Sequence, residues 1–139
     1  LMEGDYPTNE ARRVFYEKLV RELRATPEFD GAALTNRFRL VFSGGGPVEI
    51  EGREYAKDSD RTVAQFENVS ADYAAVLGQK VIEGRYLTDE DSDQREPVAV
   101  VNATFARKHF GTESAVGRRI RTAQPNGQNP GTWRRIVGV

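Results

Sequence analysis

The start of the chain carries an apolar pattern with the period of an α-helix. Hydrophobic side chains recur every four residues at Ala11, Phe15, Leu19 and Leu23. Thr8 or Asn9 can cap the start, and Pro27 disfavours helical geometry at the residue before it. The pattern therefore predicts an amphipathic helix from about residue 9 to residue 25.

The rest of the chain alternates strand-like segments with two short helices. The predicted strands are 32–42, 48–51, 61–69, 98–101, 117–121 and 133–139. The segment 98–101 is continuously apolar, which predicts a buried strand. Ser70 is a predicted N-cap for a helix that ends at Gly78, and Asn102 caps another that ends at Gly111.

The order of these elements favours one fold class. Several strands follow one another without a helix between them, so the sequence predicts an α+β fold with about three helices packed on mixed sheets. The chain fits either one compact domain or two small, closely packed subdomains. The first, 8–69, holds a helix and strands, and the second, 70–139, holds an α/β core.

Composition excludes several kinds of site. The 139 residues include 20 Lys and Arg against 21 Asp and Glu, so no broad positive field favours nucleic acid. The absence of cysteine excludes disulfides and thiol chemistry, and a single histidine, His109, excludes multi-histidine metal sites. No run reaches the roughly 20 apolar residues of a membrane span. The start at Leu1 and the stop at Val139, inside a strand-like run, indicate a piece of a longer protein.

Two loops invite a ligand-binding interpretation that their context does not favour. Residues 43–46, Ser-Gly-Gly-Gly, suggest a phosphate loop, but Pro47 and a strand follow where such a loop needs a helix. A hairpin or short connection is therefore predicted. Asp89, Asp91 and Asp93 have the spacing that opens a calcium loop, but the residues that should supply its glycine and final glutamate are Gln94 and Val100. A solvated acidic helix start is predicted instead.

The remaining candidates are also assigned structural roles. His109 has no partner nucleophile in the sequence, so it is expected to face solvent or to interact favourably with the helix dipole near the end of a helix. Asn68-Val69-Ser70 matches a glycosylation triplet that occurs often by chance. A basic patch with an aromatic residue is possible in principle from Arg118, Arg119, Arg121, Trp133, Arg134 and Arg135. Strand alternation divides these arginines between two faces, which favours a solvated face or a protein interface over nucleic-acid binding.

Several short motifs follow one another along the chain: Asn68–Tyr73, Leu77-Gly78, Glu83-Gly84-Arg85, Pro97–Asn102, Phe105-Ala106-Arg107, Phe110-Gly111, Val116–Ile120 and Arg135–Val139. In this order they resemble the periplasmic core domain of MacB/FtsX-type ABC transporter permeases. The likeness extends from about Arg12 to Val139, with Gly84 and Gly117 at turns and Phe105 and Ile120 in the core. Ala74 and Ser114-Ala115 depart from the family pattern, which affects local packing.

The resemblance implies a function that the residues alone do not supply. Residues 1–139 would be part of the periplasmic domain of an inner-membrane permease, which transmits ATP-driven motion and binds a partner or cargo in efflux or in lipoprotein or peptide export. The implied partners are a second permease copy, a cytoplasmic ATPase subunit, a periplasmic adaptor, and the membrane through flanking segments, but no nucleic acid. It implies no enzyme activity, cofactor or metal, and no catalytic residue is assigned. The alternative is a stand-alone extracytoplasmic interaction or sensor domain; a hydrolase and a nucleic-acid binder are further alternatives.

Overall fold

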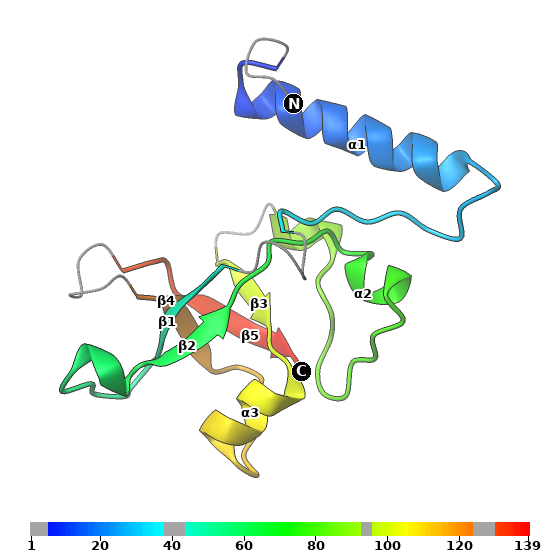
Figure 1. The fold of residues 1–139 in the computed structure, drawn as a ribbon. Coiled ribbons are helices and arrows are strands. Elements are labelled where there is room, and N and C mark those ends of the chain that lie inside the picture. Colours follow the sequence, from blue (N-terminus) through cyan, green and yellow to red (C-terminus); the bar gives the residue numbers. More distant parts are fainter. Residues whose placement is uncertain (1–5, 38–43, 93–95, 124–129) are drawn as a thin grey trace.

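A mixed five-stranded sheet forms the body of the protein (Figure 1). The computed structural model describes residues 6–37, 44–92, 96–123 and 130–139. Within them, the strands are β1 (Gly45–Ile50), β2 (Thr62–Gln65), β3 (Val98–Val100), β4 (Arg119–Thr122) and β5 (Arg134–Gly138). They lie in the order β2-β1-β4-β5-β3, with β3 parallel to β5 and the other neighbours antiparallel. This mixed sheet with its helices confirms the predicted α+β fold.

The described helices begin and end at residues whose side chains and backbone explain these limits. They are α1 (Asn9–Ala25), α2 (Tyr73–Val76) and α3 (Ala103–Phe110), with 3-10 turns η1 (Asp58–Asp60) and η2 (Asp89–Ser92). The Thr8 hydroxyl accepts a hydrogen bond from the Ala11 amide at 3.1 Å, and the Asn102 side chain accepts one from the Phe105 amide at 2.8 Å. Gly111, with φ +63°, ends α3. The predicted limits of α1 and the capping of α3 are confirmed.

The hydrophobic core lies between one face of the sheet and α3. Val48 and Ile50 from β1 meet Ile120 from β4 and Ile136 from β5, and Ile136 is fully buried. Phe105, Ala106 and Phe110 of α3 pack against this cluster, which confirms the predicted core positions of Phe105 and Ile120. Each large aliphatic side chain buried here contributes about 1.5–3 kcal/mol.

The segment before η2 crosses β5 at very short range. The Ile82 amide donates to the Val139 carbonyl at 2.8 Å, and the Arg85 amide donates to the Val137 carbonyl at 2.9 Å. Gly84 lies between them with φ +72°, opposite Gly138. Gly84 therefore lies in a β-bridge with Gly138 instead of the predicted turn, and the two glycines let the backbones approach closely.

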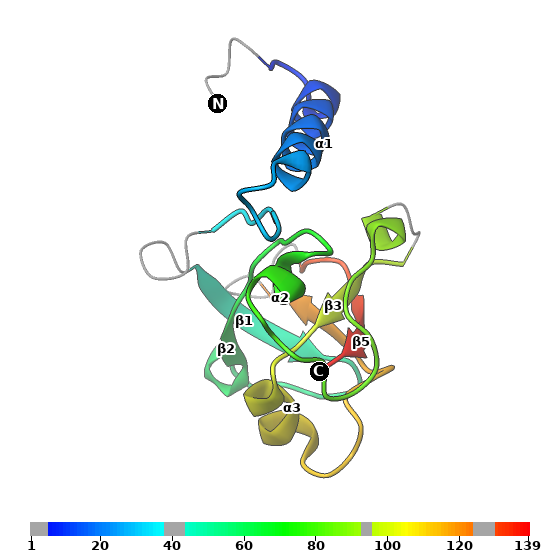
Figure 2. The ribbon, with the colours of Figure 1, turned by 90° about the vertical axis from the view of Figure 1, so that its right-hand side faces the viewer.

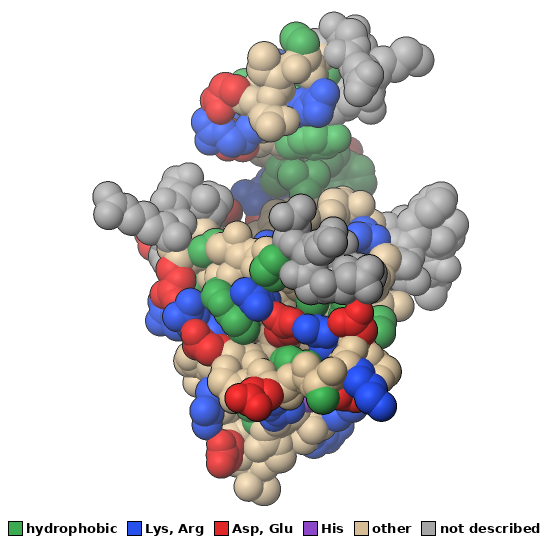
Figure 3. Space-filling model, turned by 90° about the vertical axis from the view of Figure 1, so that its left-hand side faces the viewer, with side chains coloured by type: hydrophobic (Ala, Val, Ile, Leu, Met, Phe, Trp, Pro, Cys, Tyr) green, Lys and Arg blue, Asp and Glu red, His purple; other side chains and the backbone are tan. Residues whose placement is uncertain are grey.

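Helix α1 stands apart from the sheet, as both ribbon views show (Figures 1 and 2). An ion pair between Arg24 and Asp72 joins its end to the start of α2. Beyond the helix, the Leu34 amide donates to the Ser70 hydroxyl at 2.8 Å, and Thr35 forms a β-bridge with Val69. Hydrophobic side chains gather between α1 and the body of the molecule (Figure 3). The N-terminal helix is therefore connected to the sheet through a few specific contacts near residues 69–72.

Three predictions about local structure need correction. Ser70 does not cap α2, because its hydroxyl binds the Leu34 amide and Asp72 occupies the N-cap position. Residues 32–37 form only an isolated bridge instead of a strand, and 38–42 lie outside the described residues. β3 is an edge strand with half-buried residues, so its apolar run did not indicate central burial.

Strands from before and after residue 70 lie in the same sheet. The division of the chain into subdomains at 8–69 and 70–139 stays a prediction. Across the described segments, none of the helices has the length and apolar character of a membrane span.

Candidate functional site

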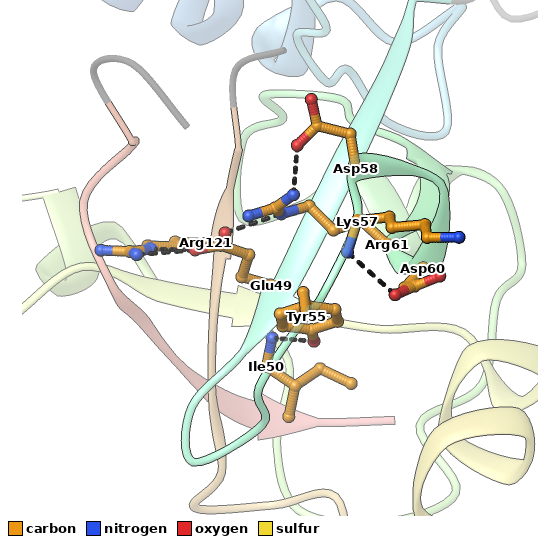
Figure 4. Close-up of polar contacts among 8 residues, drawn as sticks. All are labelled: Glu49, Ile50, Tyr55, Lys57, Asp58, Asp60, Arg61 and Arg121. Atoms are coloured by element: carbon orange, nitrogen blue, oxygen red, sulfur yellow. Dashed lines mark hydrogen bonds and ion pairs between the residues drawn. The ribbon is translucent and has the colours of Figure 1, made fainter. Parts of the chain in front are cut away.

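The face of the sheet opposite α3 is built around a buried carboxylate, Glu49 (Figure 4). Its Oε1 accepts a hydrogen bond from Arg61 Nε at 2.7 Å, and its Oε2 accepts one from Arg121 Nε at 2.7 Å. Arg121 is the cross-strand neighbour of Glu49 on β4, and Arg61 immediately precedes β2. The carboxylate therefore ties together three adjacent strands.

The two arginines keep this carboxylate ionised. Burial pushes the pKa of Glu49 upward, but the hydrogen bonds and positive charges of Arg61 and Arg121 outweigh burial and hold the pKa below its ordinary 4.5. A general acid needs a raised pKa at neutral pH. The arrangement consequently suits a structural ion-pair network better than proton transfer.

The β1–β2 connection beside Glu49 is held in shape by its own polar contacts (Figure 4). The Tyr55 hydroxyl accepts a hydrogen bond from the Ile50 amide at 2.9 Å, and Asp60 accepts one from the Lys57 amide at 3.0 Å. The Arg61 guanidinium lies 5.3 Å from the Tyr55 ring centroid and also pairs with Asp58 at 2.5 Å. The connection therefore extends the charged face as an ordered surface.

Trp133 lies on the same face between cationic side chains. The Arg121 guanidinium is 4.4 Å from the Trp133 ring centroid, and that of Arg119 is 5.9 Å away. Arg119 also pairs with Glu51 at 3.3 Å. Tryptophan and arginine together are typical of the residues that dominate protein interfaces.

The arginines divide between faces and are neutralised by acids. Arg119 is the cross-strand neighbour of Arg135, whereas Arg134 lies opposite the buried Ile120. Arg135 pairs with Glu96 at 3.2 Å, and Arg118 pairs with Glu113 at 2.7 Å. Positive and negative side chains are interspersed across the view in Figure 3. These residues therefore do not form a continuous positive stripe of the kind that binds a nucleic-acid backbone.

Asp91, one of the three acids with calcium-loop spacing, forms a second ion pair, with Arg85. Both carboxylate oxygens accept hydrogen bonds from Arg85 at 2.7 Å, and the Thr88 amide donates to it at 2.8 Å. Hydrogen bonding from Arg85 lowers the pKa of Asp91 from 3.8 to about 2. Asp93, the third acid of the pattern, lies outside the described residues. Among the residues described, no group of three metal-binding side chains comes together.

The other candidates occupy structural positions. Gly45 and Gly46 belong to β1, so the predicted hairpin or short connection is wrong at these two residues, while Ser43 lies outside the described residues. His109 is half-buried near Arg53 instead of facing solvent. In the glycosylation triplet, the Asn68 amide donates to the Asn36 side chain at 2.9 Å.

Sequence reasoning did not identify Glu49 or the Arg85–Asp91 pair. Glu49 alternates with apolar residues in the run 48–51, which is the normal pattern of an outward-facing strand residue. Its burial depends on Arg61 and Arg121, which are distant in the chain. Arg85 lies within the Glu83-Gly84-Arg85 motif, but nothing local shows that its partner is Asp91.

The mixed sheet and its helices define an α+β domain with an ion-paired outer face. The model of the MacB-like periplasmic core domain family matches residues 4–139, so the chain belongs to that family. It is accordingly a periplasmic domain of a MacB-like ABC transporter permease, an inner-membrane protein.

The fold is similar to a solved structure of the same kind. The crystal structure of the periplasmic region of MacB from Actinobacillus actinomycetemcomitans superposes with a TM-score of 0.61 at 20% sequence identity. The match covers 88% of this chain and 49% of the MacB structure, so the chain spans about half the length of that region. No curated protein matches the chain.

Proposed function

We propose that this domain transmits ATP-driven motion across the periplasmic side of a permease and binds a partner or cargo there, in efflux or in lipoprotein or peptide export. The observation that carries the proposal is the family match over residues 4–139. The partners in this proposal are a second permease copy, a cytoplasmic ATPase subunit and a periplasmic adaptor.

The way in which α1 meets the sheet supports a mechanical role. Arg24 is paired with Asp72, and the Leu34 amide is bound to the Ser70 hydroxyl. A displacement of α1 therefore reaches the body through these contacts. The sheet itself is cross-linked by Glu49 and its two arginines, which favours movement as a rigid body over bending.

We also propose that the domain is not an enzyme and that hydrolysis occurs on the ATPase subunit. Arginine contacts hold the pKa of both Glu49 and Asp91 low, which suits structural ion pairs better than acid catalysis. Hydrolytic turnover by the purified chain that is lost in the variant His109→Gln would contradict this part of the proposal.

Spin-label distances in the full-length permease with its ATPase test the mechanical role. This chain contains no cysteine, so labels can be placed at Glu113→Cys, whose side chain is 70% exposed. Adding ATP is expected to change the distance between the Glu113 labels of two permease copies. A pair of labels within one copy, at Glu51 and Glu113, is the matched control and should keep its distance. An unchanged distance between the labels of the two copies during ATP hydrolysis would refute the proposed transmission of motion.

A further inference from the structure

The side chain of Arg53 fastens the β1–β2 connection, residues 51–61, to the end of α3. Its Nη2 donates to the main-chain carbonyl of His109, and its Nη1 lies 3.5 Å from Nδ1 of the same residue. The guanidinium is also 5.8 Å from the Phe110 ring centroid. These contacts join two surface segments that are 56 residues apart in sequence.

The contact with Arg53 favours one tautomer of the neutral His109 ring. A guanidinium has donors only, so a hydrogen bond between Arg53 and Nδ1 requires that Nδ1 accept. The proton of the neutral ring is then on Nε2, which is buried and has no hydrogen-bond partner in the part of the chain that the structure describes. His109 lines a cavity of about 30 Å³ with Tyr55, Thr62 and Phe105, and this volume can hold a water molecule.

The charges around the ring oppose a second proton. Arg53, from the β1–β2 connection, and Lys108, on α3 itself, are the nearby cations. Tyr55 and Asp60 also line the cavity from the connection, and the Asp60 carboxylate accepts a hydrogen bond from the Lys57 amide. Burial of the ring, followed by the charges of Arg53 and Lys108, lowers the pKa of His109 from its ordinary 6.5.

We propose that Arg53 and His109 form a pH-sensitive latch that releases residues 51–61 from α3 when His109 takes up a proton. In the charged ring Nδ1 carries a hydrogen and can no longer accept, so two donors and two positive charges face each other. The latch is closed above the ordinary pKa of histidine and opens as the pH falls through the lowered pKa. Because residues 51–61 carry Asp58 and lead into Arg61, opening changes the charged face beside Glu49.

Nuclear magnetic resonance of the purified chain tests the latch directly. The chain has a single histidine, so one Hε1 resonance reports the His109 titration without assignment ambiguity. The measured pKa is expected below 6.5. As the pH decreases through this pKa, the protection of the amides of residues 51–61 against hydrogen exchange is expected to fall, after correction for the intrinsic exchange rate. For each unit by which the His109 pKa in the closed latch lies below its value in the open latch, protonation lowers the equilibrium constant for closing about tenfold.

Two variants separate the latch from a general effect of acid. In His109→Gln the side chain cannot take up a proton, so protection of residues 51–61 should no longer vary with pH in this range. In Arg53→Gln the ring remains but the opposing charge is removed, so the His109 pKa should rise and protection should be low at every pH. A wild-type His109 pKa at or above 6.5, or an unaltered pH dependence in His109→Gln, would overturn the proposal. If His109→Gln fails to fold, the Arg53→Gln titration still decides, because an unchanged His109 pKa there excludes the latch.

Discussion

Replacing Gly84 by alanine tests how closely residues 82–85 cross β5. A Cβ atom built on Gly84 meets the Val137 carbonyl oxygen inside contact distance, and it lies 3.0 Å from Val116 Cγ2 and 3.1 Å from Gly138 Cα. Two of these three neighbours are backbone atoms, which cannot rotate away as a flexible side chain could. The alanine must therefore push the crossing segment off the strand.

The expected loss has two parts. Alanine at the left-handed φ of +72° costs about 1–2 kcal/mol, because Cβ approaches the following carbonyl oxygen. Crowding against well-packed neighbours costs a further 1–3 kcal/mol or so. The free energy of unfolding should therefore fall by about 2–5 kcal/mol in Gly84→Ala.

Gly52 provides the matched control. It has a φ of +79°, but a Cβ atom there has nothing within 4 Å. Gly52→Ala should consequently show only the backbone cost, about 1–2 kcal/mol. Urea titrations give the free energy of unfolding of both variants. Unfolding is monitored by circular dichroism and by the fluorescence of Trp133, the single tryptophan. Equal losses in the two variants would refute the close crossing.

Three further perturbations address the core and the two ion-pair centres. Ile136→Ala, at a fully buried position, should lower the free energy of unfolding by about 2–5 kcal/mol, whereas Ile82→Ala, at a side chain 69% exposed, should have little effect in the same urea titration. Asp91 has a folded-state pKa of about 2 against an ordinary 3.8, so its stabilisation is present above pH 3.8 and is lost as the pH falls towards 2. The stability difference between wild type and Asp91→Asn should shrink over that range, and a difference independent of pH would contradict the pairing with Arg85. Glu49→Gln removes the buried negative charge that Arg61 and Arg121 share. It should lower the melting temperature more than Glu51→Gln, whose side chain is 48% exposed; the reverse order in a calorimetric scan would show that Glu49 is not the centre of the network.

Local signals in the sequence predicted local structure well. Thr8 and Asn102 cap their helices because each needs only an amide three residues further on. The fold class followed from the order of helices and strands, and the mixed sheet confirms it. Ser70 has the same capping chemistry, but its hydroxyl binds the amide of Leu34, 36 residues away. A distant partner of this kind leaves no trace in the residues beside Ser70.

The candidate site depends on such distant partners, which explains why sequence reasoning reached it only in part. The basic patch around Trp133 was identified, and its division between faces follows from strand alternation. Its neutralisation was not predicted, because Glu49 and Arg121 are 72 residues apart and meet only through the register of β1 with β4. His109 was placed in solvent because nothing near it in sequence indicates Arg53.

The pairing of the arginines has a consequence for the proposed partners. A partner that binds the charged face must replace or extend the exposed ion pairs that already exist there, such as Arg119 with Glu51. Exchanging one partly exposed ion pair for another releases little free energy. Affinity for a second permease copy at this face would therefore be low in free solution. In the proposed arrangement both copies are held by the same membrane, and an effective concentration of the order of millimolar compensates for weak contacts. A surface of this kind can form and break contacts in each transport cycle, because neither state is strongly favoured over the other.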